Sequence, residues 1–292
     1  MPKYSLELNI PLDNLDDISK KAEELKYNSL FLVNSSKNFY PDLWNTLHHI
    51  SSITKNIGLG HAMTFLISND PIAFSKLIST IDKHSSGRFE LRLGLGGNTL
   101  KKEMQNLGLE FPSYDQRVKI LDENLQIILS NLQKNSELFQ KPNPPITISG
   151  KSRNVIQLAL KYANVWEVGG FYCENYSDAL ELFHNELINS QNNKNIEKSV
   201  EIFVYVDHEK THSKHELERK LDEKYGLIQN KWLFSCGSTD DIVFDFQNYI
   251  DLGVDRFTIY FLNNHSQSSQ TPSSLLAQME IFSDSIIPNL SD

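Results

Sequence analysis

Cysteine, long apolar runs and excess positive charge are all scarce in this chain of 292 residues. Its two cysteines, Cys173 and Cys236, are too few and too isolated for a disulfide framework or a zinc cluster, so we expect two buried thiols. No stretch of about 18 apolar residues occurs, and the first residues, MPKYSLELNIP, contain neither a signal-peptide apolar region nor a cleavage site. These absences predict a cytoplasmic protein.

The charge balance of the chain bears on its partners. The formal net charge is −9 at pH 7, with lysines scattered among the acidic residues. Such a chain presents no attractive long-range field to nucleic acid or to an anionic membrane. We therefore expect a small-molecule substrate, and neither nucleic acid nor a membrane as a partner.

Short apolar runs alternate with amphipathic helical patterns along the whole chain. This alternation is typical of parallel strands joined by crossover helices. Eight strands are predicted, at residues 4–9, 30–34, 57–64, 89–95, 145–149, 165–169, 200–207 and 256–261. Eight such units form an α/β fold, the (β/α)8 TIM barrel, and we expect a single domain over residues 1–292. In such barrels the residues that follow the strands carry the chemistry.

The 3.6-residue period marks the helices between these strands. Asp70 followed by Pro71 predicts a helix start, with an N-cap and a proline in the first helical position. Two apolar helix faces are expected, formed by Phe74, Leu77, Ile78 and Ile81 and by Val118, Leu121, Leu125, Ile128 and Leu132.

The fourth predicted strand ends in glycines. Gly94, Gly96 and Gly97, followed by Asn98, leave room at its end for a flat or anionic ligand to approach the backbone. The alternative is a glycine turn that closes a barrel strand, because the pattern lacks the third glycine of a dinucleotide fingerprint.

A second candidate contact follows the fifth predicted strand. Gly150, Lys151, Ser152 and Arg153 directly precede a helical pattern. Backbone N–H groups and the helix dipole favour an anion at such a helix start, so we expect a phosphate there. The alternative is a capped helix whose Lys151 and Arg153 are solvated.

Several segments together resemble one protein family. They are 57–60 with Asn69-Asp70-Pro71, 77–89 with Ser86-Gly87-Arg88-Phe89, 117–125, 144–148 with 163–166, and 237–240 with 252–257. Their order and spacing resemble the luciferase-like superfamily of flavin- and deazaflavin-dependent oxidoreductases. The N-terminal third is most similar to the F420-dependent methylene-tetrahydromethanopterin reductases. The resemblance implies a monooxygenase or reductase that uses coenzyme F420, or alternatively FMN, and that forms a homodimer through Phe39, Tyr40, Leu43 and Trp44.

The resemblance assigns roles to Glu7 and to the Ala62–Met63 bond, and the places of His61 and Trp166 on the third and sixth predicted strands suggest roles for these two. Glu7 lies where the reductases carry a glutamate near the reacting face of the cofactor, which implies a proton donor; the alternative is an inward charge paired with a lysine or arginine. His61 is expected beside the cofactor. The bond between Ala62 and Met63 lies where relatives keep a non-proline cis peptide beneath the flavin ring. Trp166 is expected either to wall the pocket or to pack in the core.

Other features favour competing interpretations. Asn34-Ser35-Ser36-Lys37 stands where family members carry a polar pair such as Asp-His, which favours a non-catalytic flavin-binding or cofactor-free relative as the alternative function. A metal-dependent hydrolase is poorly supported, because Leu6-Glu7-Leu8-Asn9 holds no His-x-His pair, and no metal is expected. His208, His212 and His215 form either a zinc site or, as we expect, part of a solvated helix face.

Overall fold

The computed structural model describes residues 1–10, 14–34, 42–170, 175–190, 194–207, 214–225, 232–262 and 272–291. Its strands are β1 (Lys3–Ile10), β2 (Ser29–Asn34), β3 (Gly58–His61), β4 (Phe89–Gly94), β5 (Ile146–Ser149), β6 (Val165–Val168), β7 (Glu197–Val206), β8 (Phe234–Gly237) and β9 (Arg256–Phe261). Its α-helices are α1 (Leu15–Glu24), α2 (Leu43–Ile53), α3 (Pro71–His84), α4 (Asn98–Asn106), α5 (Tyr114–Lys134), α6 (Arg153–Tyr162), α7 (Tyr176–Ser190), α8 (Lys214–Tyr225), α9 (Thr239–Asp251) and α10 (Pro272–Ile281). Short helical turns cover Leu66–Ser68, Phe282–Ile286 and Ile287–Asn289.

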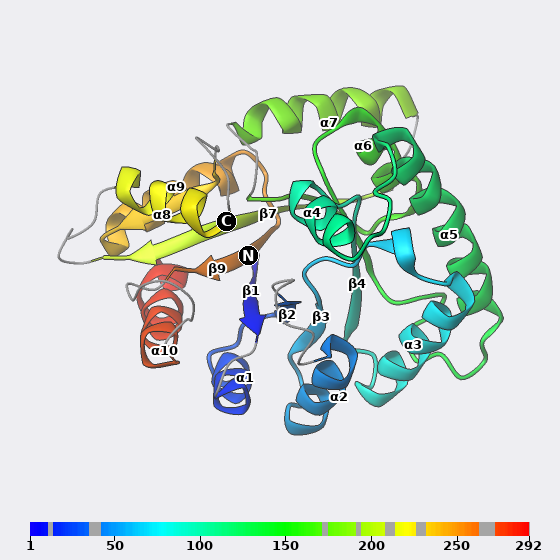
Figure 1. Ribbon diagram of the computed structural model, residues 1–292. Coiled ribbons are helices and arrows are strands. Elements are labelled where there is room, and N and C mark those ends of the chain that lie inside the picture. The colour runs from blue at the N-terminus through cyan, green and yellow to red at the C-terminus, as the bar shows by residue number, and fades with distance from the viewer. Residues whose placement is uncertain are drawn as a thin grey trace.

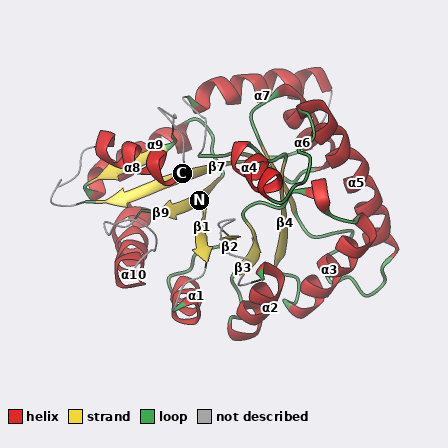
Figure 2. Ribbon diagram, viewed as in Figure 1, coloured by secondary structure: helices red, strands yellow, loops and turns green. Residues whose placement is uncertain are grey.

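Eight parallel strands close into a barrel. Neighbouring strands follow the order β6-β5-β4-β3-β2-β1-β9-β7, and β6 also pairs with β7, which joins the two ends of the sheet. The helices form an outer ring around the strands (Figure 1). In this view α4 lies near the centre, inside the ring of the other helices. Figure 2 shows the same division between inner strands and outer helices. The predicted (β/α)8 TIM barrel is confirmed.

The short strand β8 lies outside the eight-strand prediction. It pairs with the C-terminal half of β7, from Phe203 with Phe234 to Val206 with Gly237. The N-terminal half of the same edge of β7 pairs with β6, which ends at Val168. A four-residue strand next to a ten-residue strand leaves backbone groups unpaired, and β8 supplies their partners. The sequence pattern predicted no strand at residues 234–237, although β3, β5 and β6, which it did predict, are equally short.

The core lies between the barrel and the helices. Outward side chains of the strands, such as Leu6, Leu8 and Leu59, are fully buried there. The predicted face of α5 is confirmed, with Val118 half-buried and its four leucine and isoleucine members buried. On α3, Asp70 accepts a hydrogen bond from the Ala73 N–H at 2.7 Å and Pro71 is the first helical residue, as predicted. The prediction for Leu77 was wrong, because this side chain faces outward and is exposed.

Arg88, in the Ser86-Gly87-Arg88-Phe89 segment, holds several loops together. The Arg88 guanidinium donates to the carbonyl oxygens of Ser51, Ile57 and Ser85, at 2.7, 3.0 and 2.7 Å. This arrangement fastens the end of α2 to the beginnings of β3 and β4. Arg88 thus has a structural part in this protein.

Two further observations bear on composition. Within the described ranges, no helix is both long enough and apolar enough to cross a bilayer. Cys236, at the end of β8, is half-buried, so the prediction of a buried thiol was wrong for this residue. Cys173 lies outside the described residues.

Asp82 provides a test of the fold. Its carboxylate is completely buried and accepts from the Phe139 N–H at 2.6 Å, the Gln140 N–H at 3.0 Å and Gln140 Nε2 at 2.8 Å. Asp82→Ala leaves these donors without their acceptor, so we expect a loss of about 2–4 kcal/mol in the free energy of unfolding, measured by urea denaturation. The exposed Glu110 serves as control, and Glu110→Ala should change that free energy by less than about 0.5 kcal/mol. Equal values for the two variants would contradict the assignment.

Candidate functional site

The interior of the barrel is lined by charged and hydroxyl side chains. Side chains alternate along a strand, so Leu6 and Leu8 of β1 face the helices while Ser5 and Glu7 face the interior. Most TIM barrels fill this space with branched apolar residues. Buried charges are costly unless they are paired, so the pairing of these groups decides what the interior can do.

One buried ion pair crosses the middle of the barrel. Arg92 on β4 bonds to Glu167 on β6, and both side chains are buried. The Arg92 guanidinium carbon lies 4.0 Å from the ring centroid of Phe31 on β2. Glu167 also accepts from Ser199 Oγ and Thr258 Oγ1, both at 2.8 Å. Three donors from three other strands therefore fix the position of the Glu167 side chain.

A second pair lies nearer the N-terminal end of the barrel. Arg256 Nη2 donates to Glu90 Oε2 at 2.7 Å, and Thr147 Oγ1 donates to Glu90 Oε1 at 2.6 Å. Burial opposes the charge of Glu90, but Arg256 and Arg92 outweigh it and keep the pKa of this carboxyl below its ordinary value. The lower part of the barrel is therefore a floor of fixed charges.

Above this floor lies a layer that contains two further carboxyl groups. The interior of a TIM barrel is filled by layers of four side chains, and alternate strands contribute the four members of each layer. Because the strands are tilted, the height of a layer moves by about one residue from each strand to the next. Phe31, Arg92, Glu167 and Thr258 form one such layer, as their contacts show. By the same register, the next layer toward the carboxyl ends of the strands consists of Glu7, Ala62, Ser149 and Glu201.

The contacts of Gly169, just after β6, agree with this placement. A side chain at Gly169 would begin 3.3 Å from Glu201 Oε2 and 3.7 Å from Ser149 Oγ. The missing side chain therefore leaves room for Glu201 and Ser149 at one place in the barrel.

Glu201 is the unusual acid of the interior. Burial, the larger cause, and the neighbouring Glu167 carboxylate raise the pKa of Glu201 to about 7, against the opposing effects of Arg92 and the Gly170 N–H. A carboxyl group of this kind exchanges its proton near neutral pH.

Two residues predicted beside the cofactor face the helices. His61 is buried on the outward side of β3, where its ring centroid lies 4.5 Å from that of Trp44 on α2. Burial lowers its pKa to about 4, despite opposing effects of Leu43 and Asp42. Trp166 is also fully buried, and its ring stacks on Phe183 of α7 with centroids 4.4 Å apart. Side chains alternate along a strand, and His61 and Trp166 both occupy outward positions in that alternation, so they face away from the interior.

The glycines after β4 divide into two kinds. A side chain at Gly94 would meet Phe65 and Met63, and one at Gly96 would meet Leu100. Gly97 faces open space, with nothing within 4 Å of the position a side chain would take, and Asn98 beside it is exposed. Gly97 is therefore the glycine that leaves room for a ligand. The Ala62–Met63 peptide bond near this strand end is cis, as predicted.

The segment after β5 has partners of its own. Arg153 Nε lies 2.8 Å from Glu186 Oε1 on α7, and Ser152 Oγ lies 2.5 Å from the Tyr114 hydroxyl. Gly150 adopts a φ of +146°, and Lys151 is exposed. Arg153 thus points to the outer helices, whereas the backbone of the segment lies at the carboxyl end of β5.

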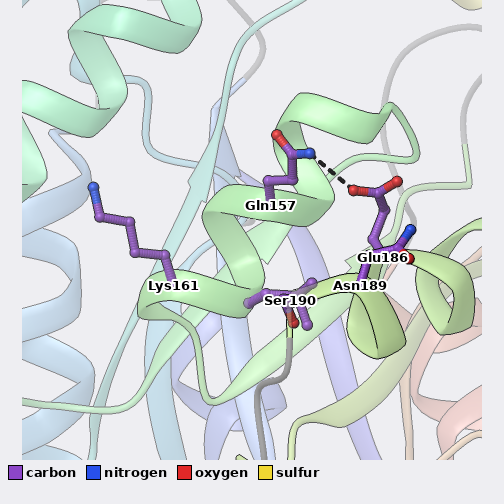
Figure 3. Close-up of a pocket in the computed structure, with 6 residues that line it drawn as sticks. Gln157, Lys161, Glu186, Asn189 and Ser190 are labelled. Carbon is purple, nitrogen blue, oxygen red and sulfur yellow. Dashed lines mark hydrogen bonds between the residues drawn. The ribbon is translucent and has the colours of Figure 1, made fainter.

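A separate pocket of about 460 Å³ lies on the outside of the barrel. It is lined by Gln157, Leu160, Lys161, Glu186, Asn189 and Ser190 from α6 and α7 (Figure 3). Gln157 Nε2 donates to Glu186 at 2.8 Å, and Lys161 pairs with Asp122 at 2.9 Å. These charges are satisfied within the protein, so the pocket offers no comparable reacting group.

The sequence interpretation missed Arg92, Glu167 and Glu201. Each is a charged residue flanked by apolar residues in its strand, two positions from another inward polar residue or glycine. That period of two was a usable signal for inward charge. Their pairing was not readable, because it depends on the register of strands far apart in the chain.

Comparisons with known proteins agree with this architecture. A family model described as luciferase-like monooxygenase matches residues 2–246. Uncharacterized proteins of Mycobacterium bovis and Mycobacterium tuberculosis are 38% identical over 58 residues, a stretch of 20% of this chain and 21% of those relatives. The chain thus matches about a fifth of the length of these curated relatives.

Solved structures share the fold over nearly the whole chain. The coenzyme F420 dependent tetrahydromethanopterin reductase from Methanopyrus kandleri has a TM-score of 0.75 at 15% identity, with 99% of both chains covered. An F420-dependent secondary alcohol dehydrogenase in complex with an F420-acetone adduct has a TM-score of 0.73 at 14% identity, covering 100% of this chain and 99% of that one. A monooxygenase from Streptomyces bottropensis has a TM-score of 0.74 at 13% identity, covering 98% and 99%.

The raised pKa of Glu201 makes stability depend on pH. The folded protein holds this proton up to about pH 7, whereas the unfolded chain releases it near 4.5. This contribution to stability is complete below pH 4.5 and is lost as the pH rises through about 7. From about pH 4.5 to above 7, we expect the free energy of unfolding to fall by about 3 kcal/mol more in the wild type than in Glu201→Gln.

Urea denaturation at several pH values measures this difference. Glu197→Gln, the same change at the beginning of β7, should keep the wild-type pH dependence. Identical curves for wild type and Glu201→Gln would show that Glu201 titrates normally.

Proposed function

Since this chain belongs to the luciferase-like monooxygenase family, we propose that it is an oxidoreductase that transfers hydride between coenzyme F420, or FMN, and a small organic substrate. The reaction takes place at the carboxyl ends of the barrel strands, with Glu7 as the proton donor. The observation that carries this proposal is the buried Glu7 carboxyl, only 7% exposed, in the layer above the fixed charges. F420 is the favoured cofactor, because two of the similar structures are F420-dependent enzymes.

The beginnings of α4 and α6 suit the phosphate of such a cofactor. Gly94 and Ser149 are register partners on β4 and β5, and the two helices begin four residues after them, at Asn98 and Arg153. Neither helix has an N-cap side chain that bonds to its first turn, a feature that they share with α1, whereas Asp42, Asp70, Ser113 and Ser238 cap α2, α3, α5 and α9. Unpaired N–H groups at two adjacent helix starts favour a bound anion.

The residues present therefore fit a phosphorylated flavin or deazaflavin. Gly97 and Asn98, with Gly150, Lys151 and Ser152, would hold the phosphate, and Ala62 and Met63 would lie beneath the ring. Gly94 and Gly96 would let the neighbouring side chains of Met63, Phe65 and Leu100 pack closely beside the cofactor. Arg153 would keep its ion pair with Glu186. The bound cofactor supplies the two electrons of the hydride.

A side chain of the protein supplies the proton that accompanies the hydride. A carboxyl group in a barrel mouth, shielded from bulk water, can act as a general acid toward a substrate heteroatom. Phe203, Trp232 and Tyr260 pack together above the β7 and β9 side of the interior and limit water there. Glu7 then donates its proton as the substrate carbon gains a C–H bond.

A homodimer in the cytoplasm completes the proposal. Of the four residues expected at the interface, Phe39 and Tyr40 lie outside the described residues, and Leu43 is half-buried on α2. Trp44 packs on His61, Phe74 and Phe89, so it contributes to the core as well. Light scattering at micromolar concentration would test the dimer.

Glu7→Gln tests the proton donor. The amide keeps the size and polarity of the side chain but has no acidic proton, so we expect turnover to fall by about 10²–10⁴-fold while F420 or FMN still binds. Steady-state kinetics and a cofactor titration by absorbance measure the two quantities. Normal turnover with bound cofactor would show that Glu7 is structural, and wild-type protein that binds neither cofactor would favour a cofactor-free relative.

Gly97→Val tests the anion site. The backbone of Gly97 is extended, with φ −129°, and a side chain there meets nothing within 4 Å, so the fold should tolerate valine. We expect the Kd for the cofactor to rise at least about tenfold, because the new side chain occupies the space before the α4 N–H groups. Gln105→Val, at an exposed position near the end of the same helix, is the control. If both variants bind like the wild type, the phosphate lies elsewhere.

A further inference from the structure

We propose that Glu201 is a positioning residue of this reaction: it holds the exchangeable proton that restores Glu7 after each turnover. The inference rests on the proposed function, since it needs a reaction that consumes a proton at the barrel mouth. It assigns a part to a carboxyl group on β7 that the proposed hydride transfer leaves unused.

The placement of Glu201 supports such a part. Glu7 and Glu201 belong to the same interior layer, on β1 and β7, with β9 between them. Glu201 reaches toward the carboxyl end of β6, where Gly169 leaves room for it and the Gly170 N–H donates to it. The layer beneath is closed by the Arg92 and Glu167 pair. Protons can therefore enter or leave this layer from the mouth side.

The charges around Glu201 leave its proton free to exchange. Burial is the larger cause that favours the protonated form of Glu201, and Glu167 on β6, which is fixed by three donors, adds to it by repelling a second negative charge. Arg92 on β4 bonds to Glu167, so it only partly offsets this repulsion. The remaining elements around Glu201 present Ser149 on β5, Thr258 and Tyr260 on β9, and Glu7 on β1.

The proposed step is a proton transfer without electron transfer. Glu7 becomes a carboxylate when its proton goes to the substrate heteroatom. The proton of Glu201 then passes to Glu7, directly or through water, and a proton from solvent restores Glu201. An acid that is half-protonated near neutral pH serves this purpose best, because it both releases and regains its proton readily.

The first measurement needs no cofactor. In protein labelled with ¹³C at the glutamate carboxyl carbon, one NMR signal should titrate near pH 7, and it should be missing from Glu201→Gln. In Glu167→Gln this titration should move to lower pH, because the repelling charge is gone and Arg92 loses its partner. If every glutamate signal titrates in the ordinary acidic range, the proposal is overturned.

The second measurement links the proton to turnover. In the wild type, turnover should fall at least about tenfold between pH 6 and pH 8.5, as the acid form of Glu201 is lost. In Glu201→Gln this fall should disappear, and in Glu167→Gln it should begin at lower pH. Glu197→Gln is the matched control on the same strand and should keep the wild-type profile.

The outcomes separate this inference from the proposed function. If the wild type binds cofactor and turns over, but Glu201→Gln keeps the wild-type pH profile, the role of Glu201 is overturned and the proposed function stands. If the wild type binds neither F420 nor FMN, the proposed function fails, and the inference fails with it. If Glu201→Gln does not fold, a wild-type turnover profile that lacks the fall between pH 6 and pH 8.5 would still overturn the role of Glu201.

Discussion

The ion pair between Arg92 and Glu167 is the interaction on which the interior of this barrel depends. Both charges are buried, and removing either would leave the other without a partner in a medium of low polarity. Glu167 also takes hydrogen bonds from β7 and β9, so one carboxylate joins four of the barrel strands. The position of this carboxylate fixes the boundary between a closed floor and the open end above it.

The charged residues below this boundary differ from those above it in how they are paired. Below it, Glu90 and Arg256 neutralise each other, and the pKa of Glu90 is held below its ordinary value. Above it, Glu201 feels the repulsion of Glu167 and only a fraction of the attraction of Arg92. Burial is the larger cause of the raised pKa of Glu201, and the repulsion of Glu167 adds to it. Together they place an exchangeable proton beside the proposed reaction site.

The residues before β4 and those after it have two different roles. Asp82 and Arg88 fasten loops at the N-terminal end of the barrel, where conserved chemistry is not expected in this fold. Gly97 and the beginning of α4 lie at the opposite end and leave open space there. A motif can thus identify the fold through residues that never approach a ligand.

The sequence by itself determined the eight barrel strands, the beginning of α3 and the inward direction of Glu7. These follow from local rules, because the strand period of two and the helix period of 3.6 act over a few neighbouring residues. Tertiary structure alone decided that His61 and Trp166 meet Trp44 and Phe183 in the outer layer, that Arg153 pairs with Glu186, and that β8 completes the edge of β7. It also decided the state of Glu201, because the distance to Glu167 depends on how strands from opposite parts of the chain are placed when the barrel closes. Charge interactions act through space, and the sequence records only the order of the residues along the chain.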